Sequence, residues 1–380
     1  DVANMLTGAT PVANGGTALT SNFVNGRTNN QMAPIIVNGD MAVAQRSAST
    51  VAQADDSNEG YATVDRFAIK FSNSAGGTIT TSRDTTTTTG FGQSIKLNVT
   101  GADTSVASTH IVDLHQTIEA QVIRNSGWNY TSSSSYLTLS FHIRSSKTGT
   151  YCVFFQTNDG TAQMYTAEYT ISSADTFEQK VISVPGNSNL QFDNDNGIGL
   201  RVGFILAVGS GRSGSAGAWT SGNASGTSNQ VNFLDSTDNI AYITGVQLEV
   251  GQFTSSTLPA FQHESFGDNL SRCQRYYYRM INENVAMATF SYYSSGRVEA
   301  GISFPVTMRT APSLVSTSGS SYFRVQRNGG DNNLNDLSAG VIGLNHASIF
   351  NTDESSGTAG HAGYGYSRGS GYLSWDAELE

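Results

Sequence analysis

The segment Tyr136-Leu137-Thr138-Leu139-Ser140-Phe141-His142-Ile143 alternates strictly between two kinds of side chain. The apolar residues fall on one face of an extended chain, and the other face carries Tyr136, Thr138, Ser140 and His142. A period of two is typical of an antiparallel strand that packs one face on a core. The segment therefore predicts a half-buried strand in an antiparallel sheet.

Other segments extend this pattern on both sides. Leu200–Val208 is nearly all apolar, as a central strand requires, and Ala241–Val250 is rich in β-formers. Many short candidate strands, with Ile35–Val37 the first of them, are separated by Gly, Asn, Asp and Ser turns. We predict an all-β protein whose main domain is a jelly-roll β-sandwich.

Composition narrows the class of function. Charged residues make up 13% of the 380 residues, net charge is −10, and only 20 Lys and Arg are present. Duplex nucleic acid and anionic membranes attract basic faces, so neither is a predicted partner. Cys152 and Cys273 form neither a disulfide framework nor a zinc spacing. No apolar run reaches the length of a membrane span, and we predict no cofactor.

Four regions follow from the pattern along the chain. Residues 1–34 form an extended N-terminal connector, 35–255 the jelly roll, 256–284 a linking helix and 285–380 a smaller, distal C-terminal β domain. The helix lacks Gly and Pro from Asn269 to Met280. It carries one apolar stripe at helical spacing, which predicts a packing or trimer surface: Leu270, Cys273, Tyr277 and Met280.

Three motifs resemble chemical signatures but lack their context. Gly209–Gly214 matches a dinucleotide-binding loop, yet the small residues that follow cannot form the required helix. Gly365–Gly369 matches a nucleophile elbow, but no His follows it. Asp193–Gly197 resembles a calcium loop in composition without the EF-hand frame. We interpret all three as loops or turns, and no carboxylate spacing singles out a catalytic pair.

Aromatic residues beside Asn, Gln and Asp are the best functional signal. Sugars stack on aromatic rings and bind planar polar groups through their hydroxyls. The alternative for an aromatic residue in a strand is a place in the core. The glycan-binding candidates are Trp128, Tyr130, Trp219, Tyr364, Tyr366, Tyr372 and Trp375.

Three stretches resemble bacteriophage tail-fibre proteins. The run TGATPVANGGT at 7–17 is similar to a spacer before fibre domains. The runs VNGDM at 37–41, VDRF at 64–67 and YITGVQLEVG at 242–251 resemble the first and last strands of a carbohydrate-binding-module-like jelly roll. The run FGDNLSRCQRYYY at 266–278 resembles the helix that follows this jelly roll in phage fibres.

This resemblance implies a structural virion protein, a tail-fibre subunit that recognises the host and adsorbs to cell-surface glycan. It implies a homotrimer, attached through the N-terminal segment to other tail or capsid proteins, on an extracellular virion assembled in the host bacterial cytoplasm. Such jelly rolls often hold calcium between an N-terminal turn and an Asp of the last strand. Here Asp40 is the calcium candidate, but Gly245 stands where the partner Asp would be.

Two alternatives remain open from the sequence. A head fibre or capsid decoration protein would share the fold without an adsorption role. A polysaccharide-degrading tailspike would need a repeat period and a carboxylate pair, and neither is evident. We expect no enzymatic activity.

Overall fold

The structure is a computed structural model that describes residues 23–24, 27–28, 34–55, 59–281 and 284–379. Most of the predicted connector, 1–34, therefore lies outside the described residues. The chain divides into two compact units. The first unit comprises the residues up to Ala42, 48–63 and 67–264, and the second unit comprises 43–47, 64–66 and 265–380. The all-β prediction is confirmed, since antiparallel strands dominate both units.

The first unit contains two six-stranded antiparallel sheets. One sheet has, in spatial order, β13 (Trp219–Thr220), β10 (Met164–Ile171), β9 (Gly149–Thr157), β12 (Ile198–Val208), β7 (Ile111–Glu119) and β4 (Ala68–Ser72). The other has β11 (Glu178–Pro185), β8 (Tyr136–Ser145), β14 (Ile240–Val250), β6 (Ser94–Gly101), β5 (Thr78–Asp84) and β3 (Val51–Gln53). Short elements complete the unit: β1 (Phe23–Val24), β2 (Arg27–Thr28), α2 (Ala120–Arg124), η2 (Ser210–Arg212) and η3 (Phe233–Asp235).

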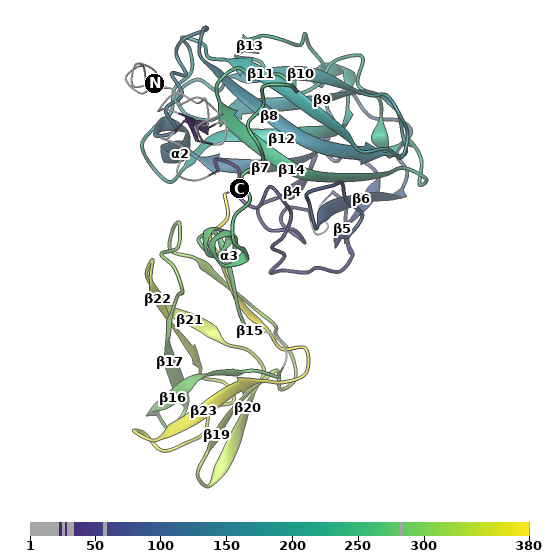
Figure 1. Ribbon diagram of the computed structural model, residues 1–380. Coiled ribbons are helices and arrows are strands. Elements are labelled where there is room, and N and C mark those ends of the chain that lie inside the picture. The colour runs from purple at the N-terminus through teal and green to yellow at the C-terminus, as the bar shows by residue number, and fades with distance from the viewer. Residues whose placement is uncertain (1–22, 25–26, 29–33, 56–58, 282–283, 380) are drawn as a thin grey trace, which may run out of the picture. The chain divides into compact units, whose positions relative to one another are not determined.

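The two sheets lie face to face, as Figure 1 shows for β8 and β14 over β9 and β12. The ring of Phe141 on β8 packs against two strands of the facing sheet, β12 and β10. Its ring centroid lies 4.9 Å from that of Phe204 on β12 and 5.2 Å from that of Tyr169 on β10, both in edge-to-face geometry. The apolar residues of the alternating segment therefore form the sandwich core, and the jelly-roll prediction is confirmed.

The first predicted strand of this unit is wrong. Ile35–Val37 is buried but belongs to no strand. The side chain of Gln116 takes the place of a neighbouring strand: its Oε1 accepts from Val37 N at 2.8 Å, and its Nε2 donates to Val37 O at 2.8 Å. A side-chain amide thus satisfies both backbone groups of a buried residue.

The second unit combines helix α3 (Phe266–Gln274) with two antiparallel sheets. The three-stranded sheet has the order β15 (Tyr277–Ile281), β24 (Leu373–Asp376), β18 (Ser313–Ser316). The seven-stranded sheet has the order β20 (Gly330–Leu334), β19 (Phe323–Arg327), β23 (Ala362–Ser367), β16 (Ala286–Ser294), β17 (Arg297–Ser303), β22 (His346–Asn351), β21 (Ser338–Ile342). A single apolar cluster that includes Phe290 and Trp375 fills the unit.

The linking helix is shorter than predicted. Ser265 caps α3 by accepting a hydrogen bond from Asp268 N, and the helix ends at Gln274. Leu270 and Cys273 lie on α3, but Tyr277 and Met280 lie on β15, so the predicted four-residue helical stripe is wrong. The run of tyrosines pairs with β24 instead, where Tyr277 is opposite Asp376 and Tyr278 opposite Trp375. Pairing with a strand about a hundred residues away overrides the local period.

Candidate functional site

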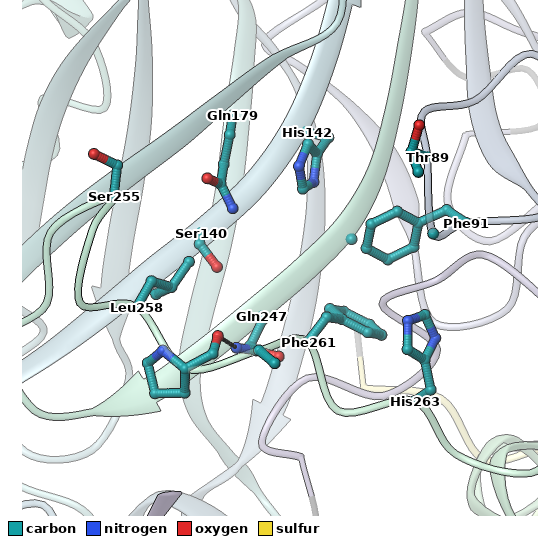
Figure 2. Close-up of a pocket in the computed structure, with 14 residues that line it drawn as sticks. Thr89, Phe91, Ser140, His142, Gln179, Gln247, Ser255, Leu258, Phe261 and His263 are labelled. Carbon is teal, nitrogen blue, oxygen red and sulfur yellow. Dashed lines mark hydrogen bonds between the residues drawn. The ribbon is translucent and has the colours of Figure 1, made fainter. Parts of the chain in front are cut away.

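A pocket lies on the outer face of the sheet that contains β8 (Figure 2). Its floor comes from the polar face of the alternating segment, through Ser140 and His142, and from Gln179 of β11 and Gln247 of β14. The cavity volume is about 290 Å³. The apolar face of β8 packs in the core. The alternation of Tyr136–Ile143 therefore puts apolar side chains in the core and polar side chains on the pocket floor.

A bulge in β14 opens the pocket. Thr244 is opposite His142 and Gln247 is opposite Ser140, so two residues of β14 are left without partners on β8. Gly245, one of them, has a φ of 62° in the left-handed region. A Cβ at this position would lie 2.6 Å from Cζ of Phe91 and 3.0 Å from Nδ1 of His142. Only glycine leaves room for both rings here.

The segment Gly251–His263 returns across the outer face of the sheet and forms one wall. Its first residue donates from Gly251 N to Tyr136 O at 2.8 Å. Further along, Gln247 is held at both ends of its amide: Nε2 donates to Pro259 O at 3.4 Å, and Oε1 accepts from Gln262 N at 3.0 Å. We call residues 251–263 the strap, because it covers the polar face of β14.

An aromatic wall forms where the strap meets the loop between β5 and β6. The ring of Phe91, from the loop between β5 and β6, lies 4.9 Å from that of Phe261 on the strap, in edge-to-face geometry. It also lies 5.3 Å from the ring of His142 and 5.4 Å from that of His263. The two phenylalanine rings give this wall its apolar surface, and the two imidazole rings add polar nitrogen atoms to it.

The pocket is lined by neutral groups. Its described lining residues supply hydroxyls, amides and imidazoles, with no Asp, Glu, Lys or Arg among them. Burial lowers the pKa of His142 below its usual 6.5, so this imidazole is neutral near pH 7. Its Nδ1 is buried and has no hydrogen-bond partner. The arrangement suits an uncharged ligand with one apolar face and several hydroxyls.

Two of the predicted glycan-binding aromatics are wrong, because they are in the core. Trp375 is fully buried and its ring packs 5.2 Å from that of Phe304. Trp128 is 3% exposed, and its Nε1 donates to Ser135 O. Neither ring has a face that a ligand could reach.

The other five candidates are at least partly accessible, but none lines this pocket. Tyr130 packs edge-on against Phe192, and Trp219 donates from Nε1 to Pro185 O at 2.7 Å. In the second unit, the guanidinium of Arg279 lies over the ring of Tyr372. Tyr366 is half-buried and Tyr364 is 53% exposed, and both lie on β23.

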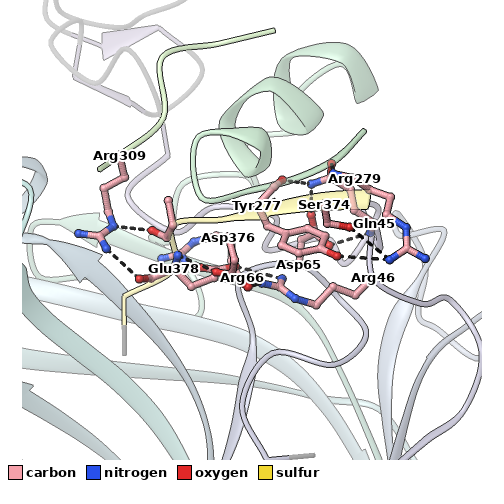
Figure 3. A network of polar contacts seen from close by, with 11 residues as sticks. Gln45, Arg46, Asp65, Arg66, Tyr277, Arg279, Arg309, Ser374, Asp376 and Glu378 are labelled. Carbon is pink, nitrogen blue, oxygen red and sulfur yellow. Dashed lines mark hydrogen bonds and ion pairs between the residues drawn. The ribbon is translucent and has the colours of Figure 1, made fainter. Parts of the chain in front are cut away.

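Tyr277, expected on the packing helix, lies instead in a buried ionic cluster of the second unit (Figure 3). The guanidinium of Arg46 lies 3.6 Å from the centre of the Tyr277 ring. Arg46 pairs with Asp376 at 2.8 Å and with Glu378 at 3.2 Å, and the fully buried Arg66 also pairs with Glu378. We call Arg46, Arg66, Asp376 and Glu378 the arginine cluster. It ties segments 43–47 and 64–66 to Asp376, at the end of β24, and to Glu378 just after it.

The calcium candidate Asp40 lies in a turn, where its carboxylate accepts from Ala42 N at 3.3 Å. No three His, Cys, Asp or Glu side chains gather in a metal-binding arrangement within the described part of the chain. Of the helices described, none has the length and apolar character that a membrane crossing requires.

Sequence reasoning did not select Phe91, Phe261, Gln179 or Gln247 as binding residues. Phe91 and Phe261 lie in loops, 170 positions apart in the numbering, and no local period connects them. The signal that was present is the polar face of Tyr136–Ile143, which contains both floor residues of β8.

Comparison with known proteins gives structural likenesses of low similarity. No protein-family profile and no curated protein matches the sequence. An enzymatically active domain of tailspike protein 4 from bacteriophage CBA120 is 14% identical over 57% of this chain, with a TM-score of 0.30, and the match spans 21% of that chain. A family 11 carbohydrate-binding module from Clostridium thermocellum, in complex with a mixed-linked tetrasaccharide, is 12% identical. That match covers 48% of this chain and 88% of the module, with a TM-score of 0.27.

A family 4 carbohydrate-binding module is also 12% identical, with coverages of 56% and 98% and a TM-score of 0.28. What this chain shares with these structures is the coarse β architecture. At this level of similarity they assign no ligand and no residue role to the chain.

Proposed function

We propose that the first unit binds a neutral saccharide in the pocket on the outer face of β8 and β14. The observation that carries the proposal is the combination of an aromatic wall with a wholly uncharged polar floor. The C–H face of a sugar ring packs on Phe91 and Phe261, and its hydroxyls bind Ser140, Gln179 and the neutral His142.

The wider role that we propose is host recognition by a bacteriophage tail fibre. It is supported by the tail-fibre resemblance of residues 7–17, 37–41 and 266–278 and by the sugar-compatible pocket. In a homotrimer on the virion, three weak pockets would bind one cell surface with far greater avidity than a single pocket. We propose binding without catalysis, because the lining offers hydroxyl, amide and imidazole groups rather than paired carboxylates.

The test is binding of the purified full chain to an array of oligosaccharides and to candidate host cells. We expect Phe91→Ala and Phe261→Ala to weaken binding to neutral saccharides by about tenfold or more, because each removes part of the stacking surface. Tyr242→Ala is the matched control, since Tyr242 belongs to β14 and does not line the pocket.

Three outcomes would change the proposal. Neutral saccharide binding that survives both phenylalanine substitutions would place the sugar elsewhere. A trimer that labels no cells would favour a capsid decoration. Release of reducing ends from host polysaccharide would favour a degrading tailspike.

A further inference from the structure

A second pocket lies on the outer face of the seven-stranded sheet, and all of its lining residues belong to the second unit. Its volume is about 360 Å³. The side chains that border it on this face come from β19, β23 and β16, which are neighbours in the sheet (Figure 1). They are Gln326, Ala362, Tyr364 and Thr289. This pocket is therefore separate from the saccharide pocket of the first unit.

The sequence of β23 turns two tyrosines outward. In the order Gly-Tyr-Gly-Tyr at 363–366, the glycines face the core. A Cβ at Gly363 would lie 2.5 Å from Cγ1 of Val325, and one at Gly365 would lie 2.3 Å from Cε2 of Phe290. The strand therefore lies close against the core, while both tyrosine rings lie on the outer face of the sheet.

Tyr364 is the more accessible ring of this pair. It is 53% exposed, and the centre of the Tyr366 ring lies 6.4 Å from its own at an angle of 38°. In the sheet, Tyr364 is directly opposite Gln326 on β19 and Thr289 on β16, and both of these residues are exposed. Directly opposite residues share one face of a sheet. A sugar ring stacked on Tyr364 therefore meets an amide on one flank and a hydroxyl on the other.

Neither arginine of β19 brings a free charge to this pocket. Arg327 borders the pocket, but its guanidinium lies on the core face of the sheet, 5.5 Å from the centre of the buried Tyr292 ring. Arg324 lies on the outer face, where it forms an ion pair with Asp331 of β20. The surface beside Tyr364 therefore suits an uncharged ligand that has hydroxyl groups.

The two pockets differ in how they surround a ligand. In the first unit, the strap and Phe91 form walls above the polar floor, so a bound sugar is contacted from more than one side. In the second unit, the exposed ring and its flanking polar groups all belong to one face of a sheet. A single sugar unit makes few contacts on such a surface. A longer chain that lies along β23 reaches both tyrosine rings, and its contacts add up.

We propose that the second unit binds an extended neutral polysaccharide along β23. Tyr364 stacks on the chain, Tyr366 extends the stacking surface, and Gln326 and Thr289 bind hydroxyls on its two flanks. This inference goes beyond the proposed function, because it gives the protein a second site for a different form of ligand. The first pocket holds a short saccharide, whereas β23 holds an internal stretch of a polysaccharide.

The test uses the full chain with neutral glucans, mannans and galactans, each as the immobilised polysaccharide and as short oligosaccharides. In the Phe91→Ala chain, we expect oligosaccharide binding to fall and polysaccharide binding to persist. Addition of Tyr364→Ala to that chain should reduce the remaining polysaccharide binding about tenfold, because it removes the main stacking ring. Added salt should leave polysaccharide binding unchanged, since no ionic contact is involved.

A matched substitution on the same sheet serves as the control. Tyr293→Ala removes a ring of β16 that is 72% exposed and does not line the pocket, so it should leave polysaccharide binding unchanged. Tyr364 and Tyr293 are both exposed, so both variants should fold, and circular dichroism checks this.

Three results would overturn the proposal. The first is that no polysaccharide of the panel binds, and the second is that Tyr364→Ala lowers binding no more than Tyr293→Ala does. The third is a fall in the solution mass of the Tyr364→Ala chain with polysaccharide binding intact, which would make this face an interface between copies. Failure of the first pocket shows instead as oligosaccharide binding that Phe91→Ala leaves unchanged, so the two failures are distinguishable.

Discussion

In the first unit, neutral hydrogen bonds hold the strap on the sheet, whereas in the second unit arginine–carboxylate pairs hold segments 43–47 and 64–66. Both devices fix a stretch of chain that has little regular structure of its own. The neutral device leaves the surface around it uncharged, which suits a pocket for an uncharged ligand. The arginine cluster is sensitive to the loss of any one of its charges, because Arg66 and Glu378 are each about 1% exposed.

Disrupting the arginine cluster should have the largest effect on stability. Glu378→Gln removes the carboxylate shared by Arg46 and Arg66, which is the acidic group that pairs with the buried Arg66 guanidinium. We expect the free energy of unfolding of the second unit to fall by about 3–5 kcal/mol. Hydrogen exchange of β24 and β8 in urea reports each unit separately, and β24 should lose protection first.

The control for this substitution is an accessible ion pair in the same unit. Arg297 and Glu299 are each about one-third exposed, so Glu299→Gln should cost about 1 kcal/mol or less. Equal losses for Glu378→Gln and Glu299→Gln would contradict the distinction between a buried cluster and a surface pair.

The bulge that opens the first pocket should give an intermediate effect. Gly245→Ala forces a side chain into a left-handed backbone and against Phe91. We expect a loss of about 1–2 kcal/mol in stability and at least a tenfold loss of neutral saccharide binding. Thermal unfolding and titration calorimetry measure the two quantities.

Gly127→Ala tests the cost of backbone strain without a side chain that obstructs the pocket. Gly127 also has a positive φ, of 86°, but an added Cβ would meet no atom within 4 Å. This variant should lose stability and retain binding. Full saccharide affinity in Gly245→Ala would show that the bulge does not shape the binding surface.

The smallest effect concerns pH. Burial lowers the pKa of His142 below 6.5, so the imidazole stays neutral as pH falls from 8 to 6.5 and gains a proton only below that range. Protonation removes an acceptor and adds a charge to a neutral pocket. We expect saccharide affinity to be constant above pH 6.5 and to weaken by at most about tenfold per pH unit below the lowered pKa.

Calorimetry at several pH values measures this dependence. His142→Gln should flatten the curve, while His346→Gln, which removes an imidazole of the second unit that does not line the pocket, should leave it in place. Affinity that rises on acidification would contradict the role given to a neutral His142.

The difference between local patterns and long-range contacts explains how much the sequence could predict. A period of two in Tyr136–Ile143 depends only on strand geometry, so it correctly predicted the buried face and the polar face. The meeting of Phe91 with Phe261 depends on how two loops cross the sheet, and no local pattern encodes that. Trp375 and Tyr277 were misplaced for a related reason, because β15 and β24 pair across about a hundred residues.

The arginine cluster also sets an order in time. Arg66 and Glu378 are 312 residues apart, so Arg66 leaves the ribosome long before its partner exists. At about 5–20 residues per second, roughly 15–60 s separate the synthesis of the two. During that interval the first unit can fold around β7, β8 and β12. Segments 43–47 and 64–66 can form their ion pairs with Glu378 only after it has been synthesised. The second unit therefore completes only after Glu378 has been made, and truncation before this residue would remove the carboxylate that Arg46 and Arg66 share.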